Sequence, residues 1–207
     1  RKHNSVEMCI AKSGQSIAKW GMANSWKPWG IAINNKSQLI ITDVLDNSIG
    51  VYTHYGRMVM QFGNHGVTMP YEERLNNPRY VTIDSHDRVI VTDYNNKKVK
   101  IFDRDGNYLT TLGDDWGPFR LSQPRGVAVD KYDNIFVCDS ELDRLMRYTS
   151  SGKCMGPLLT YEKGLYNPCV IDIDKNSNRM VIGCNGYRKR NTFNKIKIYD
   201  MEYLPWD

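Results

Sequence analysis

The chain has 207 residues, of which 41% are hydrophobic and 25% are charged, and this composition is typical of a soluble globular protein. Its length allows one large β domain or two small ones. No apolar run approaches the roughly 18–20 residues that a membrane helix needs. The first residues also lack the apolar core of a secretion signal. We therefore expect neither a membrane partner nor a signal peptide.

The formal net charge is +5, and it is unevenly distributed. Segment 185–197 contains five lysines and arginines and no acidic residue, so the rest of the chain is balanced. A local basic cluster favours an anionic partner, and a solvated loop is the alternative explanation.

Five cysteines occur at positions 9, 138, 154, 169 and 184. No Cys-x-x-Cys pair and no Cys/His spacing of a zinc site is found, so we expect no metal and no cofactor. Free thiols in an odd number are typical of a reducing compartment, which predicts a cytoplasmic location. One Asn-x-Ser triplet at 35–37 points the other way, although such triplets often arise by chance.

In chain order, the first predicted elements are two strands within residues 6–21. This segment ends in "GQSIAKWG" (14–21), and the spacing of its two glycines recurs in later units. Four longer units follow, and each begins at a proline: Pro28, Pro78, Pro124 and Pro168. The steps of 50, 46 and 44 residues between these prolines indicate a propeller, a solenoid or another repeat array.

Each unit is predicted to contain four strands, and no segment shows a convincing helical period. The first strand follows the proline, which suits a strand entrance because it cannot donate a ladder hydrogen bond. The second strand is continuously apolar ("LIIT", "VIVT", "IFVC", "MVIG"), which predicts burial on both faces. The third alternates ("IGVY", "VKIF", "LMRY", "IKIY"), and a turn glycine then leads to the fourth: Gly56, Gly106 or Gly152.

Four-stranded antiparallel units of this length predict an all-β fold, namely a β-propeller whose blades pack face to face around a channel. We treat residues 1–207 as one domain. Its predicted parts are the last strands of a preceding blade (6–21) and four successive blades (26–63, 76–113, 122–158 and 166–204). Because four and a half units do not close a ring, we expect part of a larger ring rather than five blades with an irregular join.

The repeated sequence resembles the NHL repeat. The best matches are "QPRGVAVDKYDNIFVCDS" (123–140) and "VTDYNNKKVKIFDRDGNYLTTLG" (91–113), and the resemblance runs from about residue 6 to 200. The fourth unit departs from the pattern because Cys184 stands near the position of the strand-ending aspartate. The resemblance implies a six-bladed ring, of which this chain would form a part.

Among NHL propellers, the basic, metal-free character of the chain is similar to the NHL domains of tripartite-motif proteins of the Brat-like group. This resemblance implies binding of single-stranded or hairpin RNA on one face of the ring, with repression of messenger RNAs. No RING, B-box or coiled-coil segment is recognised in the sequence, so no ubiquitin-ligase activity is assigned to this chain.

An aspartate ends the second strand of three units: Asp43, Asp93 and Asp139. Equivalent residues of successive blades would lie tens of ångströms apart, whereas a catalytic carboxylate pair needs roughly 5–10 Å. A carboxylate at this point is expected to accept hydrogen bonds from turn N–H groups. We therefore interpret these aspartates as structural.

The loops between second and third strands should share one face of the ring with the proline segments. Candidate RNA contacts on this face combine aromatic rings for base stacking, cations for phosphates and amides for base edges. They are Lys27, Trp29, Arg79, Tyr80, Tyr94, Asn95, Asn96, Lys97, Arg125, Arg144, Tyr187, Arg188, Lys189 and Arg190. Arg79 and Arg125 are the strongest candidates because both directly follow the proline. Ordinary solvated turns are the alternative explanation.

These observations predict a non-catalytic RNA-binding module for post-transcriptional regulation of messenger RNA. The alternative is a protein-interaction scaffold, such as the substrate-recruiting domain of a tripartite-motif ubiquitin ligase, and DNA is not specifically implied. An enzyme is disfavoured because no nucleophile elbow or phosphate-binding glycine loop is found. The histidines also share no repeat position and no metal-binding spacing: His3, His54, His65 and His86.

Overall fold

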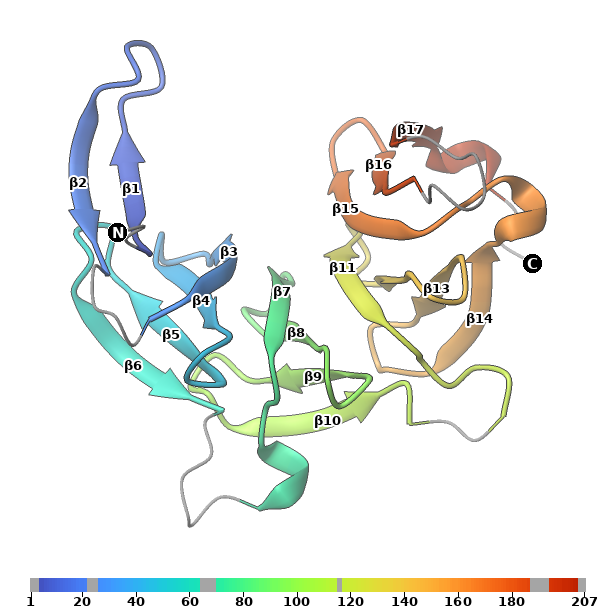
Figure 1. Cartoon of the computed structure of the whole chain (residues 1–207), viewed down its shortest axis with the longest axis horizontal. Coiled ribbons are helices and arrows are strands. Elements are labelled where there is room, and N and C mark those ends of the chain that lie inside the picture. The colour runs from blue at the N-terminus through green and yellow to red at the C-terminus, as the bar shows by residue number, and fades with distance from the viewer. Residues whose placement is uncertain (1–3, 22–25, 64–69, 115–116, 187–193, 205–207) are drawn as a thin grey trace.

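The computed structural model describes residues 4–21, 26–63, 70–114, 117–186 and 194–204, and Figure 1 shows their arrangement. These residues form five antiparallel sheets, which follow one another along a curved arc in chain order. The helical segments described are short 3-10 turns: η1 (Tyr71–Glu73), η2 (Tyr161–Lys163) and η4 (Met201–Tyr203). The predicted all-β propeller architecture is confirmed.

The sheets are named here in chain order, and the first has two strands, β1 (Val6–Cys9) and β2 (Ser16–Trp20). Blade 1 comprises β3 (Pro28–Ile33), β4 (Leu39–Asp43), β5 (Ser48–Tyr52) and β6 (Met58–Phe62). Blade 2 comprises β7 (Pro78–Ile83), β8 (Val89–Asp93), β9 (Lys98–Phe102) and β10 (Tyr108–Leu112). Blade 3 comprises β11 (Pro124–Val129), β12 (Ile135–Asp139), β13 (Arg144–Tyr148) and β14 (Cys154–Leu159). Blade 4 has three described strands, β15 (Pro168–Asp174), β16 (Arg179–Cys184) and β17 (Lys195–Asp200).

The first strands of the four blades, β3, β7, β11 and β15, lie side by side on the concave side of the arc. Glycine permits this close approach because a side chain would collide with the neighbouring backbone. A Cβ added to Gly126 of β11 would lie 2.7 Å from the Cα of Val170, and one on Gly30 would collide with the carbonyl of Arg79. The glycine two residues after the proline therefore serves the contact between blades.

The hydrophobic cores lie between consecutive blades. Phe102 of blade 2 packs with residues of blade 1 such as Ile49, and Phe136 of blade 3 packs with residues of blade 4 such as Met180. These side chains are at most 1% exposed, so each blade depends on its neighbour for burial of its apolar faces.

The second strands of blades 1–3 are buried on both faces, as their unbroken apolar sequences predict. Strand β16 of blade 4 differs from this prediction, because its residues alternate between exposed and buried. Met180 and Ile182 face blade 3, whereas Val181 is 38% exposed on the opposite face. Among the described residues, blade 4 has a neighbour on one side only, which explains the alternation.

The strand-ending aspartates hold the start of blades 1–3 in place through hydrogen bonds to backbone N–H groups. Each lies directly opposite the proline of its inner strand, as in the pair Pro78 and Asp93. The Asp43 Oδ1 atom accepts hydrogen bonds from the N–H groups of Lys27, Leu45 and Asp46 at 2.9–3.3 Å. The structural role expected for these carboxylates agrees with these contacts.

Candidate functional site

An irregular pairing at the start of every inner strand positions the candidate site. The ladder register shifts between the proline and the residue two or three positions later in β3, β7, β11 and β15. Such irregularities change the direction in which side chains point. The residue after the proline lies within this irregular stretch in each blade: Trp29, Arg79, Arg125 and Cys169.

Four of the predicted site residues come together in one row across blades 1–3. The Arg79 guanidinium carbon lies 4.8 Å from the ring centre of Trp29 and 3.4 Å from that of Tyr94. The Arg125 guanidinium carbon lies 6.0 Å from the same Tyr94 ring. Cations at these distances are attracted to aromatic faces. We call Trp29, Arg79, Tyr94 and Arg125 the arginine–aromatic row.

The two arginines of the row retain unused hydrogen-bonding capacity. The Nε atoms of Arg79 and Arg125 are buried without a hydrogen-bond partner, and the hydrogen bond between Arg79 and the Thr42 hydroxyl uses the backbone carbonyl of Arg79, not its guanidinium. Arg125 donates to the Cys169 Sγ and to the Gln123 Oε1, both at 3.3 Å. Trp29 is 47% exposed, so one ring of the row is open to a ligand.

The β8–β9 loop beside the row carries three further predicted residues. Asn95 is exposed and exchanges hydrogen bonds with Asn76 and Asn77, whereas Asn96 donates to the Asp93 carboxylate at 2.7 Å. Lys97 is exposed and has a φ of 58°. A lysine seldom adopts this left-handed conformation, which is more often taken by asparagine or glycine. Asn95 and Lys97 can therefore reach a ligand, while Asn96 supports the loop.

Two predicted residues have other partners. Tyr80 packs against the core between blades 2 and 3. Arg144 is 9% exposed, and its guanidinium pairs with the Asp139 carboxylate at 3.0 Å. It also donates to the carbonyls of Pro118 and Arg120. Contrary to the sequence-based expectation, the Arg144 cation is engaged inside blade 3 because it neutralises a buried carboxylate.

Lys27 is exposed at the start of blade 1, beside Trp29. The remaining predicted residues, Tyr187, Arg188, Lys189 and Arg190, lie outside the described residues. Sequence reasoning missed Gln123 as a neighbour of the row. Its position two residues before Arg125 was the available signal, although the contact depends on the bend at Pro124.

Two buried thiols, those of Cys138 and Cys184, are poor nucleophiles. Burial raises the pKa of the Cys138 thiol well above its usual value, and the nearby Cys169 and Cys184 raise it further. Burial also raises the pKa of the Cys184 thiol. These shifts keep both thiols protonated near neutral pH. The thiolate, not the protonated thiol, is the nucleophilic form. No disulfide joins any of the five cysteines, all of which lie in described residues.

One group among the described residues could hold a metal ion, and it lies on the opposite face of the arc. The ligand atoms of Asp84, His86 and Asp133 lie within 4.8 Å of one another. However, Asp84 already pairs with Arg88, and Asp133 accepts hydrogen bonds from the N–H and hydroxyl of Ser85. The hydrogen bonds from Ser85 to Asp133 connect the turns of blades 2 and 3.

The repeated blades and their inner strands define the fold class as a β-propeller. Residues 74–201, more than half of the chain, match the model of the 6-bladed beta-propeller family, and the chain belongs to this family. No described helix is long and apolar enough to cross a membrane.

A curated relative supports the NHL type of propeller. The chain is 34% identical over 82 residues to Protein brain tumor of Drosophila melanogaster. The match covers 39% of this chain and 7% of that protein, so the chain spans a small part of the relative's length. The predicted resemblance to Brat-like NHL propellers is confirmed at this level.

Solved structures show the same fold at low sequence identity. A nidogen in complex with laminin has a TM-score of 0.74 at 16% identity, covering 97% of this chain and 72% of that one. Virginiamycin B lyase from Staphylococcus aureus has a TM-score of 0.67 at 14% identity, covering 96% of this chain and 64% of the lyase. These similarities establish the propeller fold alone.

Proposed function

We propose that this propeller is a non-catalytic module that binds single-stranded or hairpin RNA on the face carrying the arginine–aromatic row. The observation that carries the proposal is the placement of Arg79 between the rings of Trp29 and Tyr94. Aromatic rings and guanidinium planes stack on unpaired bases, and arginines neutralise phosphates. The partial similarity to Protein brain tumor supports the resemblance to Brat-like NHL propellers, and it is this resemblance that implies RNA binding.

The row extends over neighbouring blades, which suits an elongated ligand better than a small molecule. Arg79 and Arg125 follow the prolines of adjacent inner strands, and Tyr94 lies between their guanidinium groups. A strand of RNA would cross the row, stack a base on Trp29 and place phosphates on the arginines. In this proposal the module acts in the cytoplasm in post-transcriptional regulation, and cysteines that form no disulfide suit that compartment.

The test is binding of a fluorescent random pool of single-stranded RNA, measured by anisotropy over a range of salt concentrations. The affinity should fall steeply between about 50 and 200 mM salt. The double variant Arg79→Ala/Arg125→Ala should weaken binding at least about tenfold. The slope of log affinity against log salt concentration should become shallower by about two, as expected for the loss of about two phosphate contacts. Selection from the same pool would give the preferred sequence.

The matched control is Arg104→Ala/Lys131→Ala, which removes the same charge from exposed turns on the opposite face. It should leave the affinity within about twofold of the parent protein, because these cations lie away from the row. If the two double variants lose the same amount of RNA affinity, the binding is non-specific charge attraction, and the proposed site is contradicted.

A protein-interaction scaffold is the second candidate function. The row contains tryptophan, tyrosine and arginine, which are enriched in the energetically dominant parts of protein interfaces. A partner captured equally well before and after nuclease treatment, and lost in the Arg79→Ala/Arg125→Ala variant, would favour this function over RNA binding.

A further inference from the structure

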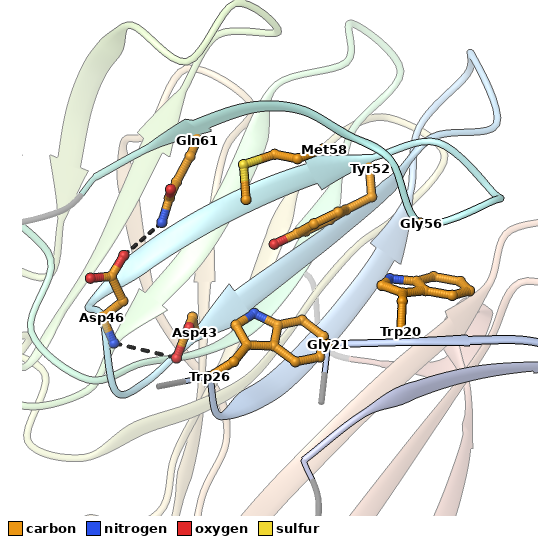
Figure 2. Close-up of a pocket in the computed structure, with 9 residues that line it drawn as sticks. All are labelled: Trp20, Gly21, Trp26, Asp43, Asp46, Tyr52, Gly56, Met58 and Gln61. Carbon is orange, nitrogen blue, oxygen red and sulfur yellow. Dashed lines mark hydrogen bonds between the residues drawn. The ribbon is translucent and has the colours of Figure 1, made fainter. Parts of the chain in front are cut away.

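A pocket between the β1–β2 sheet and blade 1 has a chemistry different from that of the arginine–aromatic row. Its volume is about 510 Å³, and its walls include Trp20, Trp26, Tyr52 and Met58. Figure 2 shows the carboxylates of Asp43 and Asp46 on the same side of this pocket as the Tyr52 hydroxyl, with Trp20 farther along. The pocket therefore combines aromatic walls with negative charge.

The corresponding carboxylates of blades 2 and 3 are each paired with a buried cation of the same blade. In blade 2 the Lys100 Nζ lies 3.1 Å from the Asp93 Oδ2, and the two side chains are 3% and 0% exposed. In blade 3 the Arg144 guanidinium lies 3.0 Å from the Asp139 Oδ2. The repeat thus places a cation on the second carboxylate oxygen.

Blade 1 lacks a cation at both of these positions. The strand register places Gly50 where blade 2 has Lys100, and Ser48 where blade 3 has Arg144. Asp43 is 4% exposed, and it accepts hydrogen bonds from the N–H groups of Lys27, Leu45 and Asp46 on Oδ1 rather than on Oδ2. Among the residues that the structure describes, no lysine or arginine pairs with Asp43.

The surroundings of Asp43 are aromatic. Trp26 occupies the position that the buried Leu75 has in blade 2. Trp26 lies against Gly21 in the same way as Leu75 lies against Gly63, the equivalent glycine of the repeat. The Trp26 and Tyr52 rings meet edge to face with centres 6.3 Å apart. The Trp20 Nε1 is buried without a hydrogen-bond partner. Burial raises the pKa of the Tyr52 phenol, and the Asp43 carboxylate raises it further, as expected near uncompensated negative charge.

We propose that this pocket binds an alkylammonium group, which takes on Asp43 the place that the Lys100 ammonium takes on Asp93. A buried carboxylate supplies the charge partner, and the rings supply the cation–π contacts with which aromatic cages recognise ammonium ligands. The Tyr52 ring lies over Gly50, where the side chain of Lys100 begins in blade 2, so the ammonium group must reach Asp43 through the pocket rather than along that path. The source is either a lysine side chain of another polypeptide or a free alkylamine.

The site is independent of the proposed RNA function. The carboxylates of Asp43 and Asp46 would repel phosphates, so an RNA crossing the arginine–aromatic row would not enter the pocket. The Arg79→Ala/Arg125→Ala variant, which should lose RNA binding, should bind the ammonium group as tightly as the parent protein does. Failure of one proposal is therefore distinguishable from failure of the other.

The test titrates the 207-residue chain with n-butylammonium chloride and follows the indole N–H resonances of Trp20 and Trp26 by NMR. We expect saturable shifts, and n-butanol, the neutral analogue, should bind at least about tenfold more weakly. Lysine blocked at both backbone ends, compared with norleucine blocked in the same way, tests a polypeptide source. Binding of blocked lysine indicates a side chain as the ligand, and binding of butylammonium alone indicates a free amine.

Two variants locate the site on the Asp43 carboxylate. Asp43→Asn keeps an oxygen for the three N–H groups and removes the charge, so butylammonium binding should weaken at least about tenfold. Ser48→Arg places a cation where blade 3 has Arg144, and it should block binding while the protein stays folded. Asp105→Asn, which changes an exposed carboxylate in the β9–β10 turn, is the matched control and should bind as the parent does.

The proposal is overturned if about 10 mM butylammonium gives no saturable shift, since that concentration would nearly saturate a millimolar site. Equal affinities for butylammonium and n-butanol would also overturn it, and this comparison needs no variant. Undiminished binding in a folded Ser48→Arg protein would contradict the assigned position, even if Asp43→Asn failed to fold.

Discussion

Blades 1 and 2 place the same strand-ending aspartate in opposite electrostatic surroundings. In blade 2, Asp93 is fully buried against the Lys100 ammonium, and a pocket of about 340 Å³ in this blade is lined by Lys100 rather than by Asp93. In blade 1, Gly50 replaces the lysine and a pocket remains above Asp43. The equivalent aspartate is therefore covered by a cation in blade 2, whereas in blade 1 it lines an acidic pocket.

The largest expected effect comes from breaking the ion pair of blade 2. Lys100→Met leaves the Asp93 carboxylate buried without its cation, and we expect a loss of about 3–5 kcal/mol in the free energy of unfolding. Urea denaturation followed by circular dichroism measures this loss. The double variant Asp93→Asn/Lys100→Met removes both charges and should be clearly more stable than Lys100→Met. If the two variants are equally unstable, the cost lies in packing rather than in the unpaired charge.

The same variant should change the pH dependence of stability. Burial raises the pKa of the Asp93 carboxyl, and Lys100 opposes that shift, so removing Lys100 should raise the pKa further. A raised folded-state pKa means that the group favours folding below its unfolded-state pKa and that this contribution is lost as pH rises. The deficit of Lys100→Met should therefore be largest at neutral pH and shrink on acidification. A deficit that stays constant down to about pH 4 would contradict this cause.

A smaller effect is expected from a change of cation in blade 3. Arg144→Lys retains the positive charge but cannot contact Asp139 and both the Pro118 and Arg120 carbonyls in the same geometry. We expect a loss of about 1–3 kcal/mol, the cost of leaving buried acceptors without donors. Thermal or urea denaturation provides the measurement, and the exposed Arg104→Lys serves as a control. A loss no larger than that of the control would show that the carbonyl contacts contribute little.

The smallest effect is expected in blade 1. Asp43→Asn preserves an acceptor for three backbone N–H groups and leaves no described cation unpaired, so we expect a change within about 1 kcal/mol. Asp93→Asn, the matched substitution, should cost more because it leaves the Lys100 ammonium without its charge partner. Equal costs for the two substitutions would remove the proposed difference between the blades. Both are measured by urea denaturation at pH 7.

Much of the fold could be predicted from the sequence because its signals are local and repeated. Proline marks each strand entrance, and the apolar second strands follow in register, so the four strands of blades 1–3 fall where the repeat indicates, whereas blade 4 has three described strands. Arg79 and Arg125 were recognisable as equivalent because each follows a proline. Their contacts with the Tyr94 ring were harder to predict, since the tyrosine lies in a loop and reaches across blades.

The roles of Arg144 and Tyr80 could not be predicted from their positions. Arg144 belongs by sequence to a polar loop, yet its guanidinium turns toward Asp139 inside blade 3. Tyr80 follows Arg79, yet its ring packs between blades 2 and 3. In both cases the direction of the side chain depends on which neighbour offers a carboxylate or an apolar surface, and that neighbour lies far away in sequence.

The sequence by itself determined the blade architecture, because strand alternation, turn glycines and prolines act within a few residues and recur with each unit. Only the tertiary structure decided which side chains meet between blades. The stacking of Arg79 and the pocket at Asp43 both depend on the sizes of side chains contributed by separate sheets, as when Gly50 stands where another blade has lysine. Packing at close range thus distinguishes blades that share one repeat.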